Sequence, residues 1–183
     1  MHFFNAFLPI ALLATPIFAS PVDIDARAGI LEARAGDLEA RAGPTVTCRA
    51  TDKTNAKKTS TKSFTVEVDV AKDLVKSLGV NHKDSTGYPH AYTNKDKLTW
   101  NEAACKKTNI DLLEYPVFWK GAKPLDQKKS IKNQAHSPIR VVYANSGGSA
   151  VYCGIMTHTD LKKDQDWGKQ ESWIGSSGFV ECE

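Results

Sequence analysis

The chain has 183 residues, of which 24 are Lys or Arg and 21 are Asp or Glu, so its formal net charge is +3. Hydrophobic residues make up 41% and charged residues 25%, a composition that favours a globular protein over a collagenous or fully disordered chain. The basic balance favours a polyanionic partner, such as nucleic acid or an acidic membrane surface.

The first nineteen residues have the pattern of a secretory signal. Residues 3–18 are nearly uncharged and rich in Phe, Leu, Ile and Ala, and Ala19 supplies a small residue for cleavage. The apolar run contains two prolines and is short for a membrane span. We therefore expect residues 1–19 to be a signal peptide and the product to be a secreted, soluble protein.

A seven-residue repeat follows. Ala-Arg-Ala-Gly begins at Ala26, Ala33 and Ala40, and each glycine costs about 1 kcal/mol in a helix, which argues against a coiled coil. We predict that residues 20–41 are a propeptide cut near residues 41–43; a linker that stays attached is the alternative. Residues 1–41 hold three arginines and five acidic residues, which leaves 21 basic and 16 acidic residues, a net charge of +5.

The start of the predicted mature domain, residues 42–183, contains two strand patterns and one helix. Residues 45–48 and 64–68 have strand composition, and residues 49–63 between them are expected to form an exposed hairpin or loop. Four apolar residues between 71 and 78 fall at helical spacing, with Asp69 expected to cap the helix and Gly79 to end it.

The rest of the chain is predicted as strands and long loops. A turn at residues 145–149 separates two of the strand candidates, which are residues 112–119, 138–145, 150–159 and 179–182. Two long polar loops are expected, residues 120–137 and 160–178, and loops of this length are usually functional. The predicted fold class is α+β, with one helix packed on a twisted antiparallel sheet.

All four cysteines, Cys48, Cys105, Cys153 and Cys182, lie in the mature domain. An even count behind a signal peptide indicates two disulfides, for which the sequence allows three pairings. Joining Cys48 to Cys182 would tie the ends of the domain together, which leaves Cys105 for Cys153. The cysteines and histidines lack the paired spacing of metal sites, so we expect no metal and no cofactor.

Five polar residues lie in or beside the apolar segments: Tyr88, His90, Glu114, Arg140 and His158. Such side chains are costly to bury unless they are paired or functional. Together they supply a base, an acid, a guanidinium and a hydroxyl, the groups of a metal-free ribonuclease. Singly, each has a more ordinary explanation, such as a cross-strand ion pair. On one face of a sheet, the arginine should keep the carboxylate ionised, and the carboxylate should keep a histidine protonated.

The segments around these residues resemble the small fungal guanyl-specific ribonucleases, and more closely the fungal ribotoxins of the α-sarcin and hirsutellin group. The resemblance runs from Thr47 to the C-terminus and is carried by residues 88–90, 113–116, 138–145, 152–159 and 179–182. It implies the microbial ribonuclease fold and a metal-independent endoribonuclease that forms a 2′,3′-cyclic phosphate.

The resemblance also implies a role for each site residue. Glu114 is the general base on the ribose 2′-hydroxyl, and His158 is the general acid on the leaving 5′-oxygen. His90 assists electrostatically or as a base, and Arg140 and Tyr88 hold the phosphoryl oxygens. Phe179 shields the site and Asn94 contacts it.

In ribotoxins the substrate is one bond in the sarcin–ricin loop of large-subunit ribosomal RNA. The lysine triplet (Lys128, Lys129 and Lys132) matches the region that grips this RNA, and the resemblance implies contact with acidic phospholipid membranes and action as a monomer. Phe179, where larger ribotoxins carry leucine, and the long segment 160–178 depart from the pattern. The alternatives are a broad guanyl-preferring extracellular ribonuclease and a non-catalytic effector with a ribonuclease fold.

Overall fold

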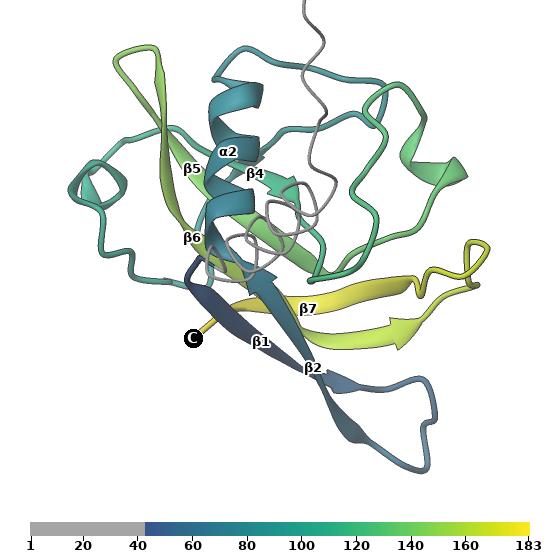
Figure 1. The fold of residues 1–183 in the computed structure, drawn as a ribbon. Coiled ribbons are helices and arrows are strands. Elements are labelled where there is room, and N and C mark those ends of the chain that lie inside the picture. Colours follow the sequence, from purple (N-terminus) through teal and green to yellow (C-terminus); the bar gives the residue numbers. More distant parts are fainter. Residues whose placement is uncertain (1–42) are drawn as a thin grey trace, which may run out of the picture. The chain divides into compact units, whose positions relative to one another are not determined.

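Seven strands within residues 43–183 form one sheet (Figure 1). The structure is a computed structural model that describes these residues, and the predicted signal peptide and propeptide lie outside them. The strands are β1 (Thr45–Asp52), β2 (Ser60–Glu67), β3 (His90–Tyr92), β4 (Leu112–Pro116), β5 (Ile139–Ser146), β6 (Ser149–Lys163) and β7 (Trp173–Glu181). Their order is β2-β1-β6-β5-β4-β3, and β7 also pairs with β6.

Strands β1 and β2 form the first hairpin. For residues 49–63 a hairpin or a loop was expected, and the structure shows the hairpin. Their antiparallel register runs from Thr45 opposite Glu67 to Asp52 opposite Ser60. Strand β1 also pairs with β6, but in parallel, so the sheet is mixed and the prediction of a wholly antiparallel sheet was wrong. A hairpin forces its two strands to be antiparallel, whereas β1 and β6 are far apart in sequence and no tight turn fixes their relative direction.

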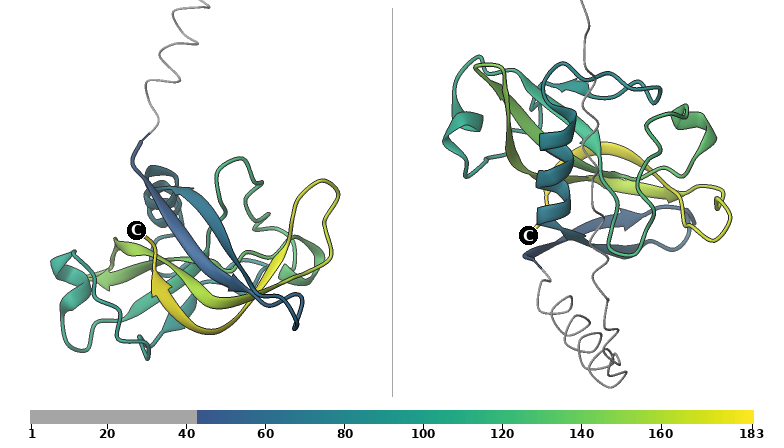
Figure 2. Two further views of the ribbon diagram at one scale, coloured as in Figure 1. Left: turned by 90° about the horizontal axis from the view of Figure 1, so that it is seen from below. Right: turned by 45° about the horizontal axis from the view of Figure 1, so that its top comes forward.

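Helix α2 (Val68–Leu78) packs against the sheet (Figure 2). It buries Val68, Ala71, Val75 and Leu78, the apolar stripe that an amphipathic helix presents to a core. Asp69 is not the cap: the helix begins after Glu67, whose side chain makes no capping hydrogen bond, and Asp69 lies in the first turn. No helix among residues 43–183 is long and apolar enough to cross a membrane.

Gly79 ends helix α2, as predicted. Its φ of 61° belongs to the left-handed region that glycine tolerates, and its N–H donates to the carbonyl of Val75. The chain then turns into the segment that leads to Tyr88.

The alternation of strand side chains separates two apolar clusters. Tyr115, Val141 and Ile155 belong to the larger cluster, together with the buried residues of helix α2. Val142 and Met156 belong to a second cluster that includes Trp100. Because neighbouring residues of a strand point to opposite faces, residues next to Tyr115 and Val141 face away from the helix.

Both predicted disulfides are present. Cys48–Cys182 joins β1 to the end of the chain, where the N–H of Glu183 also donates to the carbonyl of Thr47. Cys105–Cys153 joins a 3-10 helix, Ala103–Lys106, to β6. A bridge of this kind typically stabilises a small domain by about 2–4 kcal/mol, mainly by restricting the unfolded chain.

Segment 160–178 is not a polar loop. Strand β6 continues to Lys163 and β7 begins at Trp173, so most of the segment belongs to a long hairpin. Leu161 and Trp173 are buried, while the residues between them are polar and mostly exposed. With so few apolar positions, the strand period could not be read from the sequence. The short strand β3 and a 3-10 helix at Ile131–Asn133, within the predicted loop 120–137, were also missed.

Candidate active site

The sheet register brings the candidate catalytic residues to one face. Glu114 lies opposite His90 on one side and Val142 on the other. Arg140 lies two residues before Val142 and opposite Met156. His158 follows two residues after Met156, opposite Phe179. Since directly paired residues and residues two apart share a face, Glu114, Arg140 and His158 converge there.

Arg140 is held in place before any substrate arrives. Its Nη1 donates to the carbonyls of Ser137 at 2.6 Å and Ile139 at 2.9 Å, and its Nη2 donates to the Tyr88 hydroxyl at 3.2 Å. Its Nε is buried without a hydrogen-bond partner among the described residues, 3.9 Å from Oε1 of Glu114. An immobile guanidinium with an unused buried N–H is suited to a phosphoryl oxygen.

The carboxylate of Glu114 lies between the side chains of Arg140 and His90. Its Oε1 lies 3.9 Å from both Nε of Arg140 and Nδ1 of His90. The Glu114 side chain is 13% exposed and that of His90 is 54% exposed. Tyr88 stacks on His90, with ring centroids 4.0 Å apart, so the tyrosine supports the imidazole beside Glu114.

His158 is fixed by the irregular pairing of β6 and β7. The register shifts between His158 and Asp160, which inserts one extra residue of β7 opposite β6. Ser177 in this bulge has φ 67°, and its carbonyl lies 3.0 Å from Nδ1 of His158. A proton on Nδ1 therefore donates to this carbonyl and Nε2 is left for the substrate.

Gly175 and Phe179 both lie against the ring of His158. A Cβ on Gly175 would lie 2.0 Å from Cδ2 of His158, so only glycine allows the imidazole to lie against β7. Phe179 covers the ring, with centroids 4.0 Å apart, and it meets Tyr92 edge-on at 6.0 Å. This position of Phe179 is consistent with the shielding role expected of it.

Burial dominates the electrostatics of the site, and one expectation was wrong. Burial raises the pKa of Glu114, and the attraction of Arg140 only partly opposes this effect. Burial also lowers the pKa of His90, and Arg140 lowers it further, so the carboxylate does not keep this histidine protonated. For His158, burial lowers the pKa while the hydrogen bond to Ser177 opposes the shift. Loss of solvation outweighs the nearby opposite charges.

Asn94 and the lysine triplet are not part of this cluster. The Oδ1 of Asn94 accepts from the Tyr92 hydroxyl and from the N–H of Leu98, and its Nδ2 donates to the Leu98 carbonyl. Asn94 therefore closes a turn next to the site. The triplet lies in the segment around the 3-10 helix Ile131–Asn133, where Lys129 pairs with Asp126 at 3.3 Å.

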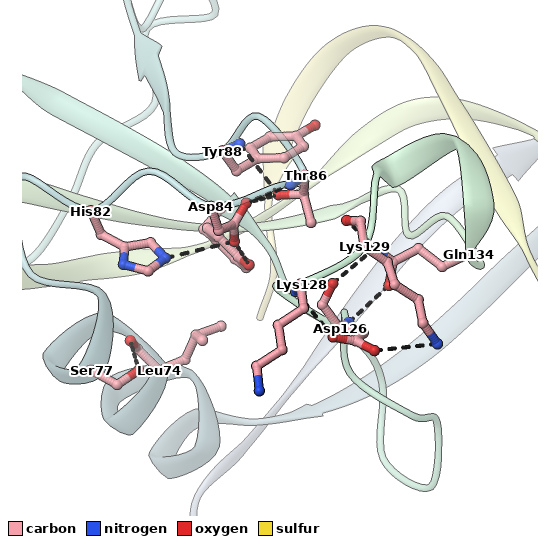
Figure 3. Close-up of polar contacts among 11 residues, drawn as sticks. Leu74, Ser77, His82, Asp84, Thr86, Tyr88, Asp126, Lys128, Lys129 and Gln134 are labelled. Carbon is pink, nitrogen blue, oxygen red and sulfur yellow. Dashed lines mark hydrogen bonds and ion pairs between the residues drawn. The ribbon is translucent and has the colours of Figure 1, made fainter.

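A second polar network, centred on Asp84, lies next to Tyr88. The sequence analysis did not predict it. Asp84 is 3% exposed and accepts hydrogen bonds from Thr86 and from the Tyr115 hydroxyl, the latter at 2.5 Å. Nε2 of His82 lies 3.8 Å from it (Figure 3). Burial and Asp84 raise the pKa of Tyr115, which stays a hydroxyl donor. Tyr115 meets Tyr88 edge-on at 5.7 Å, so the network positions the tyrosine that contacts Arg140.

The same view shows how two of the three lysines, Lys128 and Lys129, are supported (Figure 3). Asp126 accepts from the N–H of Lys128 and pairs with Lys129, while Gln134 forms hydrogen bonds with the backbone of Asp126 and with the carbonyl of Lys129. Ser85 and Gln127 are joined through their backbones. The segment that carries the lysines is therefore attached to the segment that carries Tyr88. Within residues 43–183, no group of three His, Cys, Asp or Glu side chains is arranged to hold a metal ion.

One family model and one solved structure match this chain. The family model described as ribonuclease matches residues 49–167. The solution structure of hirsutellin A from Hirsutella thompsonii matches with a TM-score of 0.59 and 32% sequence identity, and the match covers 77% of this chain and 100% of hirsutellin A. No curated protein sequence matches the chain. The family match and the full coverage of hirsutellin A show that this chain belongs to the ribonuclease family, in its hirsutellin-like group of fungal ribotoxins.

Proposed function

We propose that this ribonuclease is a secreted ribotoxin that cuts one phosphodiester bond in the sarcin–ricin loop of large-subunit ribosomal RNA and so stops translation. The observation that carries the proposal is the convergence of Glu114, Arg140 and His158 on one sheet face, with His90 and Tyr88 at its edge. The predicted signal peptide and the two disulfides support secretion.

The proposed reaction is an internal transfer of the phosphoryl group. Glu114 takes the proton of the ribose 2′-hydroxyl, and the 2′-oxygen forms a bond to phosphorus. The bond from phosphorus to the 5′-oxygen breaks, and His158 gives that oxygen a proton from Nε2. The products are a 2′,3′-cyclic phosphate and a free 5′-hydroxyl. His90 assists as a positive charge or as a second base.

Charge that develops on the phosphoryl oxygens is met by groups that already have fixed positions. The guanidinium of Arg140 and the Tyr88 hydroxyl that it contacts are the donors for this charge. Pre-oriented donors need no reorganisation during the reaction, which makes them more effective than solvent. Phe179 keeps water from one side of His158.

The ribosomal target rests on the lysine triplet, whose apolar neighbours are few and whose charges are exposed. Contacts from these lysines to RNA phosphates would release counterions and strengthen binding to a large RNA. Exposed lysines would equally attract acidic phospholipids during entry into a cell. The proposed maturation step is removal of residues 20–41, which would raise the net charge of the enzyme.

The test compares intact ribosomes with a dinucleotide. We expect the mature protein to release one discrete fragment from large-subunit RNA, and to convert GpA to a cyclic guanosine phosphate that chromatography detects. Glu114→Gln and His158→Gln proteins are the controls for contaminating nucleases. Degradation of ribosomal RNA to a smear would instead support the broad guanyl-preferring ribonuclease. A folded protein that cleaves neither substrate would support the non-catalytic effector.

A further inference from the structure

A cavity of about 170 Å³ adjoins the proposed active site. Tyr88 and Arg140 form part of its wall, and it is also lined by His136 and by Ile174 and Gly175 of strand β7. Gly175 is also the residue that lies against the His158 ring. The cavity therefore begins where the candidate site ends, on the side of the general acid.

His136 is fixed at this cavity by the long β6–β7 hairpin. Its Nδ1 lies 3.0 Å from Oδ2 of Asp164, and its backbone N–H donates to Oγ of the fully buried Ser172 at 2.8 Å. Ser172 in turn donates to the same oxygen of Asp164 at 3.0 Å, and the N–H of Trp173 donates to the His136 carbonyl. Together these bonds hold the residue and set the direction of its ring.

The second ring nitrogen of His136, Nε2, does not take part in these hydrogen bonds. Among residues 43–183, Nε2 of His136 has no hydrogen-bond partner, and it is not one of the buried unpaired atoms. The hydrogen bond from His136 holds the pKa of Asp164 below its usual range, so this carboxylate is ionised and accepts the proton of Nδ1. A partner on one nitrogen orients the other nitrogen toward a ligand.

We propose that His136 binds the RNA phosphate immediately 3′ of the cleaved bond, and that the cavity is a subsite for the nucleotide that leaves. The inference rests on the proposed cleavage by Glu114 and His158. Because His158 protonates the leaving 5′-oxygen, the RNA beyond that oxygen continues past Gly175 toward His136. In the proposed complex both ring nitrogens carry a proton, so that Nδ1 donates to Asp164 and Nε2 donates to the phosphate. Ile131 and Ile174 offer apolar surface to the ribose.

The alternative is that His136 has only a structural role and attaches the segment before β5 to the β6–β7 hairpin. The backbone bonds of His136 with Ser172 and Trp173 would do this with any side chain. A test must therefore separate loss of this attachment from loss of the imidazole.

Three short substrates make the separation possible. GpA contains only the cleaved phosphate, GpApA adds one phosphate on the 3′ side, and ApGpA adds one on the 5′ side. We expect the wild type to cleave the bond after G in GpApA with a higher kcat/KM than in GpA. The GpApA to GpA ratio of kcat/KM should fall roughly 3- to 10-fold in His136→Gln, the range of one net hydrogen bond. The change should lie in KM, as for a contact made equally before and during the reaction.

Ser172→Ala is the matched structural control. It removes the hydrogen bonds of the Ser172 hydroxyl with His136 and Asp164 but keeps the imidazole. We expect it to lower the melting temperature while it retains a GpApA to GpA ratio above that of His136→Gln. A second control is the ApGpA to GpA ratio, which should be the same in His136→Gln and wild type.

The outcomes are distinct. If wild type cleaves GpA but shows no preference for GpApA, the subsite is refuted and the proposed ribonuclease mechanism stands. If His136→Gln and Ser172→Ala lower all three rates and the melting temperature in parallel, His136 is only a structural fastener and the proposal is wrong. If wild type cleaves none of the substrates, the proposed function fails and the subsite falls with it.

Discussion

Replacing Glu114 with Gln tests the mechanism and the electrostatics of the site together. The substitution keeps the shape of the side chain and its place between His90 and Arg140 but removes the base. General bases contribute about 10²–10⁴-fold, so kcat/KM for GpA should fall by that factor, which corresponds to roughly 2.7–5.5 kcal/mol of barrier.

The pH profile gives a sharper result than the rate alone. Cleavage needs Glu114 ionised, and its pKa is raised above 4.5; it needs His158 protonated, and the pKa of His158 is lowered below 6.5. Both shifts narrow the active range, so kcat/KM should form a narrow bell in weakly acidic solution. In Glu114→Gln the acid limb due to Glu114 should disappear. A bell that is unchanged in this variant would refute the assignment of the base.

Although Glu114→Gln should lower activity, it should raise the stability of the fold relative to wild type as the pH increases. Because the folded-state pKa of Glu114 is raised, its stabilising contribution is complete below pH 4.5 and is lost as the pH rises through the folded-state pKa. The free energy of unfolding of Glu114→Gln, relative to wild type, should therefore increase between pH 4 and pH 7. Urea unfolding at several pH values measures this difference. A relative stability that falls over this range would show that the Arg140 ion pair outweighs burial.

Three further predictions follow from other side chains. His158→Gln should lower the cleavage of GpA by about 10²–10⁴-fold, while EDTA should leave the wild-type rate unchanged; loss of activity in EDTA would contradict a metal-free mechanism. Replacing the lysine triplet with Ser should reduce the cleavage of ribosomes far more than the cleavage of GpA. It should also flatten the salt dependence of ribosome cleavage, by about 0.7 in log–log slope for each single-strand phosphate that the variant no longer neutralises. A variant without Lys72 and Lys76 of helix α2 is the charge control. Tyr115→Phe removes the donor to buried Asp84 and should destabilise the protein by about 1–3 kcal/mol; an unchanged melting temperature would show that water replaces the hydroxyl.

The sequence by itself singled out the candidate catalytic residues and predicted much of the fold. Polar residues such as Glu114 and Arg140 stand out because they interrupt apolar strand patterns, and burial of an unneeded charge is costly. The helix was readable because its apolar stripe and Gly79 are local features. The two disulfides followed from the even count and the terminal positions of Cys48 and Cys182.

The tertiary structure decided what depends on neighbours distant in the chain. The prediction contained neither the parallel pairing of β1 with β6 nor the hairpin in segment 160–178. The direction of a strand, and the formation of a strand with a weak apolar period, are decided by pairing between residues far apart in the sequence. The tertiary structure also decided the direction of the pKa shifts, since neither the contact of Glu114 with Arg140 nor the burial of both side chains can be read from the sequence.

The same reason explains the networks around Asp84 and His136. Their partners, Tyr115 and Asp164, lie 31 and 28 residues away along the chain. Residue types and their spacing record local periods of two and 3.6, and these place a side chain on a face of its own element. Which side chain from another element meets it there depends on register and packing, and these are properties of the whole folded domain.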